Sequence, residues 1–242
     1  MTPEQKAAFL TVYRGLPRAG PGRPEDVRWA VAQAARGGSL RVLDAACGPG
    51  ADLVTLAQAL PKARIEGLDH LPQFVDAARR RSAGCGERVT VALGDMRRPE
   101  GKFDLIWCAG ALYFLGVTEG LRAWRAALTA DGVVAFSEPV LLNRPANDAV
   151  TAFWEEYLQV TDINGINEQV EAAGYARQAH RIIVGDPWKA YYDPLQERVT
   201  ALREMAPGPD LAHVLDDTQR EIDRWHAAPD EIAYALLLVA PA

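Results

Sequence analysis

The stretch from Val42 to Leu53 combines an apolar strand, an acid at the end of that strand, a glycine turn and the start of a helix. Gly48 and Gly50 in the turn let the backbone approach a ligand at distances where a Cβ atom would collide. The helix that begins after the turn offers free backbone N–H groups and a partial positive charge to whatever sits on the turn. This combination predicts a binding site for a small polar cofactor.

Acidic residues also follow the next two apolar runs, at Asp69 and at Asp95. Asp44 could attract an ammonium group, Asp69 could accept hydrogen bonds from two ribose hydroxyls, and Asp95 could accept one from an adenine amino group. Met96 would pack beside that same group. Each acid alone is a weak signal because aspartate is common in turns. Three of them at successive strand ends favour a cofactor with an amino-acid end and an adenosine.

A dinucleotide is the alternative cofactor, and its usual phosphate-binding pattern is Gly-x-Gly-x-x-Gly. Gly48 and Gly50 match that pattern, but Leu53 stands at the third glycine position. Asp44 precedes the turn, where a pyrophosphate disfavours an acid. Both points count against an NAD(P)-dependent oxidoreductase, which stays open as an alternative beside a non-catalytic cofactor-binding module.

Short apolar strands alternate with helices between residues 40 and 137. This alternation is typical of a parallel sheet that is covered by helices on both faces. We expect an N-terminal helical cover at 1–37 and a main domain at 38–242, with helical lid segments at 139–174 and 185–230. The sequence predicts strands at 40–44, 64–68, 89–93, 103–108, 133–137, 175–184 and 234–239, and helices at 3–14, 24–36, 51–60, 72–83, 118–129, 146–158, 167–173 and 187–227, the last interrupted near Pro194 and at 207–209.

The composition suits one large domain, with 242 residues, a net charge of −6 and 49% apolar side chains. Basic residues form no dense run, so we expect no nucleic-acid partner. No signal peptide or long apolar run is evident, so we expect a cytoplasmic protein without a membrane partner. Cys47, Cys85 and Cys108 lack metal-ligand spacing, which predicts free thiols and no metal. The sequence does not indicate an oligomeric state.

Together these features resemble the class I S-adenosylmethionine-dependent methyltransferases over roughly residues 38–138. Val42–Leu53 is similar to the first motif of that family, Asp69 to its ribose-binding acid, and residues 94–96 to its adenine-binding segment. The resemblance implies a Rossmann-like, seven-stranded, mostly parallel sheet with helices on both faces and helical lid insertions after the fifth and sixth strands. It also implies S-adenosyl-L-methionine as the cofactor and in-line transfer of its methyl group to a small molecule. The Leu16–Gly22 loop and the aromatic C-terminal half resemble a bacterial, small-molecule-type branch of uncertain substrate.

The sequence departs from the family at some positions. Ala46 stands where the first motif has its first glycine. Alanine suits this turn only if its φ is negative, so we expect a slightly rearranged loop. His70 follows Asp69 and could hydrogen-bond a ribose hydroxyl, stack near adenine, or be an exposed loop histidine. Ala109 leaves no acid directly after the fourth strand, so a carboxylate there cannot be a base.

The resemblance also suggests residues for catalysis and for acceptor binding. Glu138, after the fifth strand, is favoured over His180 as a general base, and Tyr113 could hold the sulfonium cation against its ring. Arg18 could pair with the methionine carboxylate, or be a solvated loop charge. The acceptor atom can be oxygen, nitrogen or carbon. The predicted cofactor residues are Arg18, Asp44, Ala46, Gly48, Gly50, Asp69, His70, Asp95 and Met96, and the predicted acceptor-pocket residues are Tyr13, Trp154, Trp188 and Tyr192.

Overall fold

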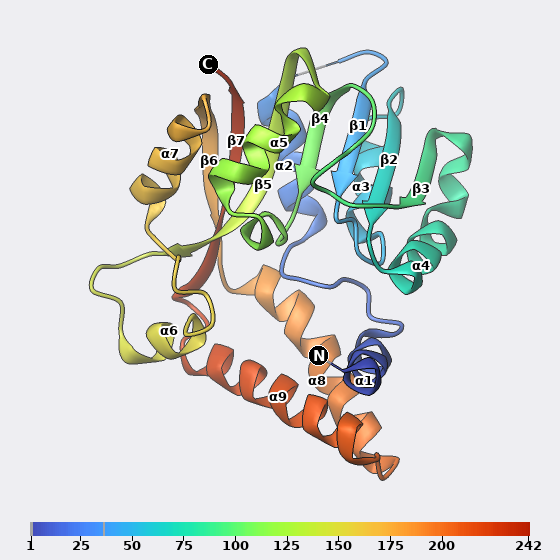
Figure 1. Cartoon of the computed structure of the whole chain (residues 1–242), viewed down its shortest axis with the longest axis vertical. Helices are drawn as coiled ribbons and strands as arrows, with labels where there is room; N and C mark the ends of the chain where they lie inside the picture. The colour runs from blue at the N-terminus through green and yellow to red at the C-terminus, as the bar shows by residue number, and fades with distance from the viewer. Residues whose placement is uncertain (1, 36) are drawn as a thin grey trace.

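A computed structural model describes residues 2–35 and 37–242 of the chain, and a seven-stranded sheet forms its centre (Figure 1). The strands are β1 (Arg41–Ala45), β2 (Arg64–Asp69), β3 (Val89–Leu93), β4 (Phe103–Cys108), β5 (Leu128–Leu141), β6 (Tyr175–Ile183) and β7 (Ile232–Pro241). They are ordered β3-β2-β1-β4-β5-β7-β6. Among the described strands only β7 runs antiparallel to its neighbours. The prediction of a seven-stranded, mostly parallel sheet is therefore confirmed.

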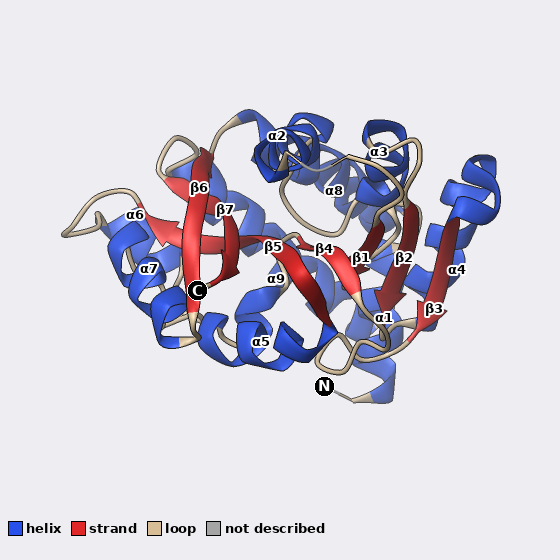
Figure 2. Cartoon of the chain, turned by 90° about the horizontal axis from the view of Figure 1, so that it is seen from above, coloured by secondary structure: helices blue, strands red, loops and turns tan. Residues whose placement is uncertain are grey.

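Helices cover both faces of this sheet. They are α1 (Pro3–Tyr13), α2 (Pro24–Ala34), α3 (Ala51–Ala59), α4 (Pro72–Ser82), α5 (Val117–Trp124), α6 (Asp148–Phe153), α7 (Ile163–Ala172), α8 (Asp186–Glu204) and α9 (Pro209–Ala227), with short 3₁₀ helices η1 (Ala83–Arg88), η2 (Leu112–Phe114) and η3 (Arg125–Ala127). Figure 2 shows α2 and α3 on one face and α5 and α7 on the other. Successive side chains of a strand point to opposite faces, so Val42 and Leu43 of β1 belong to two separate cores.

The strand order creates a crevice at the carboxyl end of β1. This strand lies between β2 and β4, and the chain proceeds from β1 toward one edge of the sheet and from β4 toward the other. In open α/β sheets, ligands bind at such a reversal, outside the carboxyl ends of the strands. Asp44, near the end of β1, and Asp69, at the end of β2, lie at this crevice.

The two N-terminal helices occupy different places. α1 packs on α8 and α9, and Figure 1 shows these three helices together, away from the sheet. α2 instead packs on α3 and β7. The expected cover at 1–37 therefore contributes one helix to the lid and one to the face of the sheet. Met1 lies outside the described residues, and so does Arg36, which is the predicted end of the second helix. No helix in the described ranges is long and apolar enough to span a membrane.

Several predicted element boundaries differ from the structure, and two of these differences have a clear physical reason. α8 continues through Pro194, although a proline removes one backbone hydrogen bond from a helix. Leu195 and Val199 are fully buried beside it, and this burial stabilises the helix across the proline. β5 already begins at Leu128 rather than at residue 133, because it pairs with the start of β4 through a shift in register.

Candidate active site

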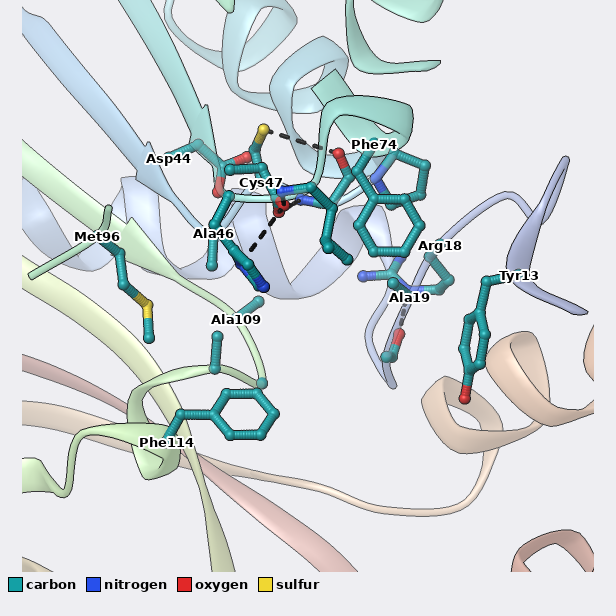
Figure 3. A pocket seen from close by; sticks show the side chains of 18 of the residues that line it. Tyr13, Arg18, Ala19, Asp44, Ala46, Cys47, Phe74, Met96, Ala109 and Phe114 are labelled. Carbon is teal, nitrogen blue, oxygen red and sulfur yellow. Dashed lines mark hydrogen bonds and ion pairs between the residues drawn. The ribbon is translucent and has the colours of Figure 1, made fainter. Parts of the chain in front are cut away.

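A cavity of about 950 Å³ lies at the carboxyl ends of β1, β2 and β4 (Figure 3). α1, α8 and α9 contribute residues to its other side. Its volume is near the upper end of the range for small-molecule sites, which leaves space for a cofactor and a second small molecule. The predicted site residues that line it are Tyr13, Arg18, Asp44, Ala46, Gly48, Asp69, His70, Asp95, Met96 and Tyr113.

The turn after β1 has a left-handed backbone at three residues. The φ angle is 61° at Ala46, 54° at Gly48 and 83° at Gly50. The expectation of a negative φ at Ala46 is therefore wrong. The turn keeps its left-handed shape, and Ala46 carries a strain of about 1–2 kcal/mol. The N–H of Cys47 donates to the carbonyl of Leu68 at 2.9 Å, which holds the turn against β2.

Gly50 does not line the cavity, contrary to its prediction as a cofactor residue. A Cβ atom at this position would lie 2.8 Å from the Cα of Ala78 in α4. Gly50 is needed because the start of α3 packs closely against α4, and because its own φ is positive. Its role is therefore to fix the two helices that support the turn.

Asp44 lines the cavity with an almost fully buried side chain. Its Oδ2 has no hydrogen-bond partner among the described residues. Burial, and then the nearby carboxylates of Asp52 and Asp69, raise the pKa of Asp44 well above its usual range. An unpartnered buried carboxyl oxygen is unfavourable. A positively charged ligand group against it would provide both a hydrogen bond and a counter-charge.

Arg18 reaches the cavity from the loop between α1 and α2. Its Nη2 lies 3.3 Å from Oδ1 of Asp52, with 12% and 10% of the two side chains exposed. The indole N–H of Trp107 donates to the other oxygen of Asp52 at 3.1 Å. The alternative interpretation of Arg18 as a solvated loop charge is wrong. Asp52, which is not among the residues predicted from the sequence, lines the cavity and holds Arg18 in place.

Asp69 fixes two loops at the edge of the cavity. Its Oδ2 accepts from the N–H of Gly48 and its Oδ1 from the N–H of Leu71, each at 2.9 Å. Each oxygen keeps a further acceptor position. Hydrogen bonds from ribose hydroxyls to Asp69 stay a prediction. The adjacent His70 lines the cavity with an exposed side chain, and its contact with the ribose or the adenine also stays a prediction.

Asp95 lines the cavity beside Met96, after the end of β3. The guanidinium of Arg97 contacts both of its oxygens, with Nη2–Oδ2 at 2.6 Å and Nε–Oδ1 at 3.0 Å. These hydrogen bonds lower the pKa of Asp95 to about 2. Arg97 already occupies this carboxylate. The adenine contact of Asp95 therefore stays a prediction, and it requires Arg97 and the adenine amino group to share the carboxylate.

One part of the cavity is lined by aromatic rings and a carboxylate. We call it the aromatic side: Phe9, Tyr13, Tyr113, Tyr191 and Glu221. The hydroxyl oxygens of Tyr13 and Tyr191 are 3.1 Å apart. Tyr191 and Glu221 are not among the residues that the sequence predicts for this site. The hydrophobic pattern of α8 does not distinguish Tyr191 from the adjacent Tyr192. Glu221 is one of several acids on α9, and the sequence pattern predicts a solvated position for all of them.

Three of the predicted acceptor-pocket residues lie in the core instead. Trp154, Trp188 and Tyr192 are at most 9% exposed and do not line the cavity. The ring of Trp188 lies 4.8 Å from that of Tyr234 on β7, and the ring of Tyr192 lies 5.0 Å from that of Trp225 on α9. These rings attach the lid helices to the sheet and to each other.

The two candidate catalytic residues have different positions. Glu138 is 2% exposed and lies outside the cavity lining. The Tyr157 hydroxyl donates to its Oε1 at 2.6 Å, and burial raises the pKa of Glu138 to about 7. Tyr113 lines the cavity, with its ring 5.6 Å from that of Tyr157. Catalytic roles for Glu138 and Tyr113 stay predictions. His180, the weaker candidate base, is exposed on the edge strand β6.

Comparison with known families decides the kind of domain that carries this cavity. Residues 42–132 match the family described as a methyltransferase domain. This segment of the chain is similar to a methyltransferase domain, and we call residues 42–132 the methyltransferase domain. The match begins in β1 and ends in β5, so it includes the strand ends that carry Asp44, Asp69 and Asp95. The lid helices α1, α8 and α9, which contribute most of the aromatic side, lie outside it.

Individual proteins resemble the methyltransferase domain as well. The chain is 32% identical over 136 residues to the demethylmenaquinone methyltransferase of Deinococcus radiodurans, covering 54% of this chain and 55% of that protein. It is 28% identical over 187 residues to the trans-aconitate 2-methyltransferase of Streptomyces avermitilis, covering 73% and 70% of the two. The alignment thus spans about half the length of the first relative.

A solved structure covers nearly the whole fold. The S-adenosylmethionine-dependent methyltransferase of Geobacter sulfurreducens, in complex with S-adenosylhomocysteine, superimposes with a TM-score of 0.85 at 20% identity. The superposition covers 98% of each chain. The methyltransferase domain and its lid therefore share one fold with that protein, from α1 to β7.

Proposed function

We propose that the chain is an S-adenosylmethionine-dependent methyltransferase that acts on a small organic molecule. The observation that carries this proposal is the carboxyl group of Asp44, which is buried and unpartnered beside the turn of a methyltransferase domain. That position suits the ammonium group at the amino-acid end of the cofactor. The bound S-adenosylhomocysteine of the Geobacter relative supports the same cofactor.

The remaining residues of the cofactor site fit this group. Arg18 borders the cavity near Asp44 and can approach the cofactor carboxylate, since its pairing with Asp52 uses one of its nitrogens. Asp69 would accept from the ribose hydroxyls, and Asp95 with Met96 would border the adenine. The cavity is large enough for both the cofactor and an acceptor.

A dinucleotide fits the same cavity poorly. Asp44, Asp52 and Asp69 lie close enough together that Asp52 and Asp69 raise the pKa of Asp44, after the effect of burial. A pyrophosphate would add negative charge next to these carboxylates. Asp52 also lies in the first turn of α3, where it already complements the positive end of that helix. These charges support a cationic cofactor over NAD(P).

When bound, the cofactor supplies an electrophilic methyl group on a positively charged sulfur. The protein aligns the acceptor with that methyl group and excludes water, which accounts for much of the rate in such transfers. Tyr113 lines the cavity, and α1, α8 and α9 contribute residues to its far side. Burial raises the pKa of the Tyr13 and Tyr113 hydroxyls, so both stay neutral and can act as hydrogen-bond donors.

Methyl transfer can be tested by the release of S-adenosylhomocysteine. The protein is incubated with S-adenosylmethionine and with panels of small amines, phenols and carboxylic acids. We expect acceptor-dependent release that Asp44→Asn reduces by about tenfold or more, because it removes a charged hydrogen bond to the cofactor. Release that is unchanged in Asp44→Asn, or absent with every panel, would contradict the proposal.

We also propose that the protein works in the reducing cytoplasm. Cys47, Cys85 and Cys108 are free thiols, and two of them are buried. Free cysteines are typical of reducing compartments, and this observation supports the proposed location.

A further inference from the structure

The aromatic side carries a carboxylate without a cationic partner. Glu221 retains exposed surface and lines the cavity. It accepts a hydrogen bond from the buried Tyr192 hydroxyl at 2.7 Å, and no ion pair joins it to a described residue. Although the residue is exposed, desolvation by the neighbouring protein raises the pKa of Glu221. A negative group held in this way favours a ligand that brings a positive charge.

Tyrosine rings surround this carboxylate. Burial raises the pKa of Tyr13, Tyr113 and Tyr191, and the charge of Glu221 raises each of them further. The three hydroxyls therefore stay neutral and add no negative charge of their own. Tyrosine faces attract organic cations, most strongly where water is excluded. Carboxylate and rings together match the two parts of an ammonium group on an apolar body.

An anionic acceptor finds less to bind. Arg18 is paired with Asp52, and Arg97 with Asp95. Among the described residues that line the cavity, Lys6 and His70 are the other basic side chains, and both are exposed. The basic side chains are thus either already paired or exposed. Glu221 is exposed as well, but it accepts a hydrogen bond from Tyr192 and lies among the tyrosines of the aromatic side.

We propose that the methyl acceptor is a small amine with an aromatic or apolar body, bound as its ammonium ion with Glu221 as the counter-ion and the rings of Tyr13, Tyr113 and Tyr191 around it. This inference rests on the proposed function, because it assigns the second molecule in the same cavity. It concerns recognition of the acceptor and so leaves the cofactor side unchanged.

The proposal can be tested with three probes that differ in one group. Phenethylamine, 2-phenylethanol and 3-phenylpropanoate carry an ammonium, a hydroxyl and a carboxylate on the same aromatic body. Each is titrated calorimetrically into protein saturated with S-adenosylhomocysteine. We expect the amine to bind about tenfold or more tightly than either of the others. Equal or weaker binding of the amine, including no binding of any probe, would overturn the proposal.

A pair of variants assigns the effect to one side chain. Glu221→Gln should weaken phenethylamine binding about tenfold and leave the affinity for S-adenosylhomocysteine unchanged. Glu156→Gln is the matched control, because Glu156 is close enough to influence Glu221 but does not line the cavity. Equal losses in the two variants, or none in either, would refute the role of Glu221.

The order of the titrations separates the two proposals. If the unmodified protein fails to bind S-adenosylhomocysteine, the proposed function is contradicted before an amine is added. If S-adenosylhomocysteine binds and the amine is not preferred, the proposed function stands and the amine class alone is refuted.

Discussion

Single residues at the end of β1 combine strain with unfulfilled hydrogen bonding. Ala46 adopts a φ of 61°, and Asp44, two positions earlier, has a buried oxygen without a partner among the described residues. Both features are unfavourable for folding. Their presence side by side at a ligand cavity indicates that this turn is shaped for a bound molecule, with the surrounding sheet holding it in place.

The strain at Ala46 predicts a stabilising substitution. Ala46→Gly should raise the free energy of unfolding by about 0.5–1 kcal/mol, because relief of the left-handed strain exceeds the entropy that glycine adds to the unfolded chain. Urea unfolding measures the change. Ala45→Gly is the control, since Ala45 is a buried residue within β1 and should lose stability instead. A loss of stability in Ala46→Gly would contradict the assigned strain.

The buried carboxyl of Glu138 predicts a pH-dependent stability. Its pKa rises from 4.5 to about 7 through burial. The unfolded chain therefore loses this proton at lower pH than the folded one, and stability falls as pH rises through this window. Glu138→Gln removes the effect. The difference in unfolding free energy between Glu138→Gln and the unmodified protein should therefore shift in favour of the variant by roughly 3 kcal/mol from about pH 5 to about pH 8.

Urea unfolding at the two pH values checks this. The exposed Glu204→Gln controls for the loss of one negative charge. A difference between Glu138→Gln and the unmodified protein that does not vary with pH would show that Glu138 stays ionised in the fold.

The sequence predicts the acids at the strand ends but not their partners. Asp44, Asp69 and Asp95 all line the cavity, as expected from the edge at which parallel strands end. Arg97 engages Asp95 and Asp52 engages Arg18 through side-chain contacts that depend on the folded loops. The contact between Arg97 and Asp95 is local along the chain, whereas Arg18 and Asp52 are 34 residues apart and meet only in the folded protein, so spacing alone could not predict which acids are already paired.

At the scale of elements, the close packing of α3 against α4 positions the turn. Gly50 caps α3, and a Cβ there would meet both Cα and Cβ of Ala78 at under 3 Å. The packing of α3 against α4 therefore fixes the end of the turn and keeps the turn residues beside β1.

This packing predicts a difference between two glycines. Gly50→Ala should destabilise the protein by about 2–4 kcal/mol, since it adds a collision with α4 to the strain of a positive φ. Gly174→Ala should cost about 1 kcal/mol, because Gly174 has a similar φ of 80° and an added Cβ would meet nothing within 4 Å. Thermal or urea unfolding of both variants measures the difference. Equal losses would contradict the close approach of α3 and α4.

The lid helices illustrate what periodicity leaves undetermined. The sequence predicts helix over 187–227, and α8 and α9 occupy most of that range. Tyr191 faces the cavity and Tyr192 contacts Trp225 in the core, although the two are adjacent. A rotation of α8 by about 100°, the angle between successive helical residues, would exchange them. Only the packing of the lid on the sheet fixes that rotation, which is why the prediction selected Tyr192 and missed Tyr191.

At the scale of the whole molecule, the cavity combines a part inside the matched family segment with a part outside it. The match to the methyltransferase family ends at residue 132 and includes the strand ends of the cofactor side. The aromatic side comes mainly from α1, α8 and α9, which the chain folds over that domain from both of its ends. The fold class could therefore be predicted from one recognisable segment, whereas the acceptor site required the complete structure.

The central claim is that this cavity binds the methyl-donor cofactor, and calorimetric titration with S-adenosylhomocysteine and, separately, with NADH tests it most directly. The account predicts micromolar binding of S-adenosylhomocysteine, no binding of NADH, and affinity lowered about tenfold or more in Asp44→Asn. Binding of NADH alone, or S-adenosylhomocysteine binding that does not depend on Asp44, would contradict it.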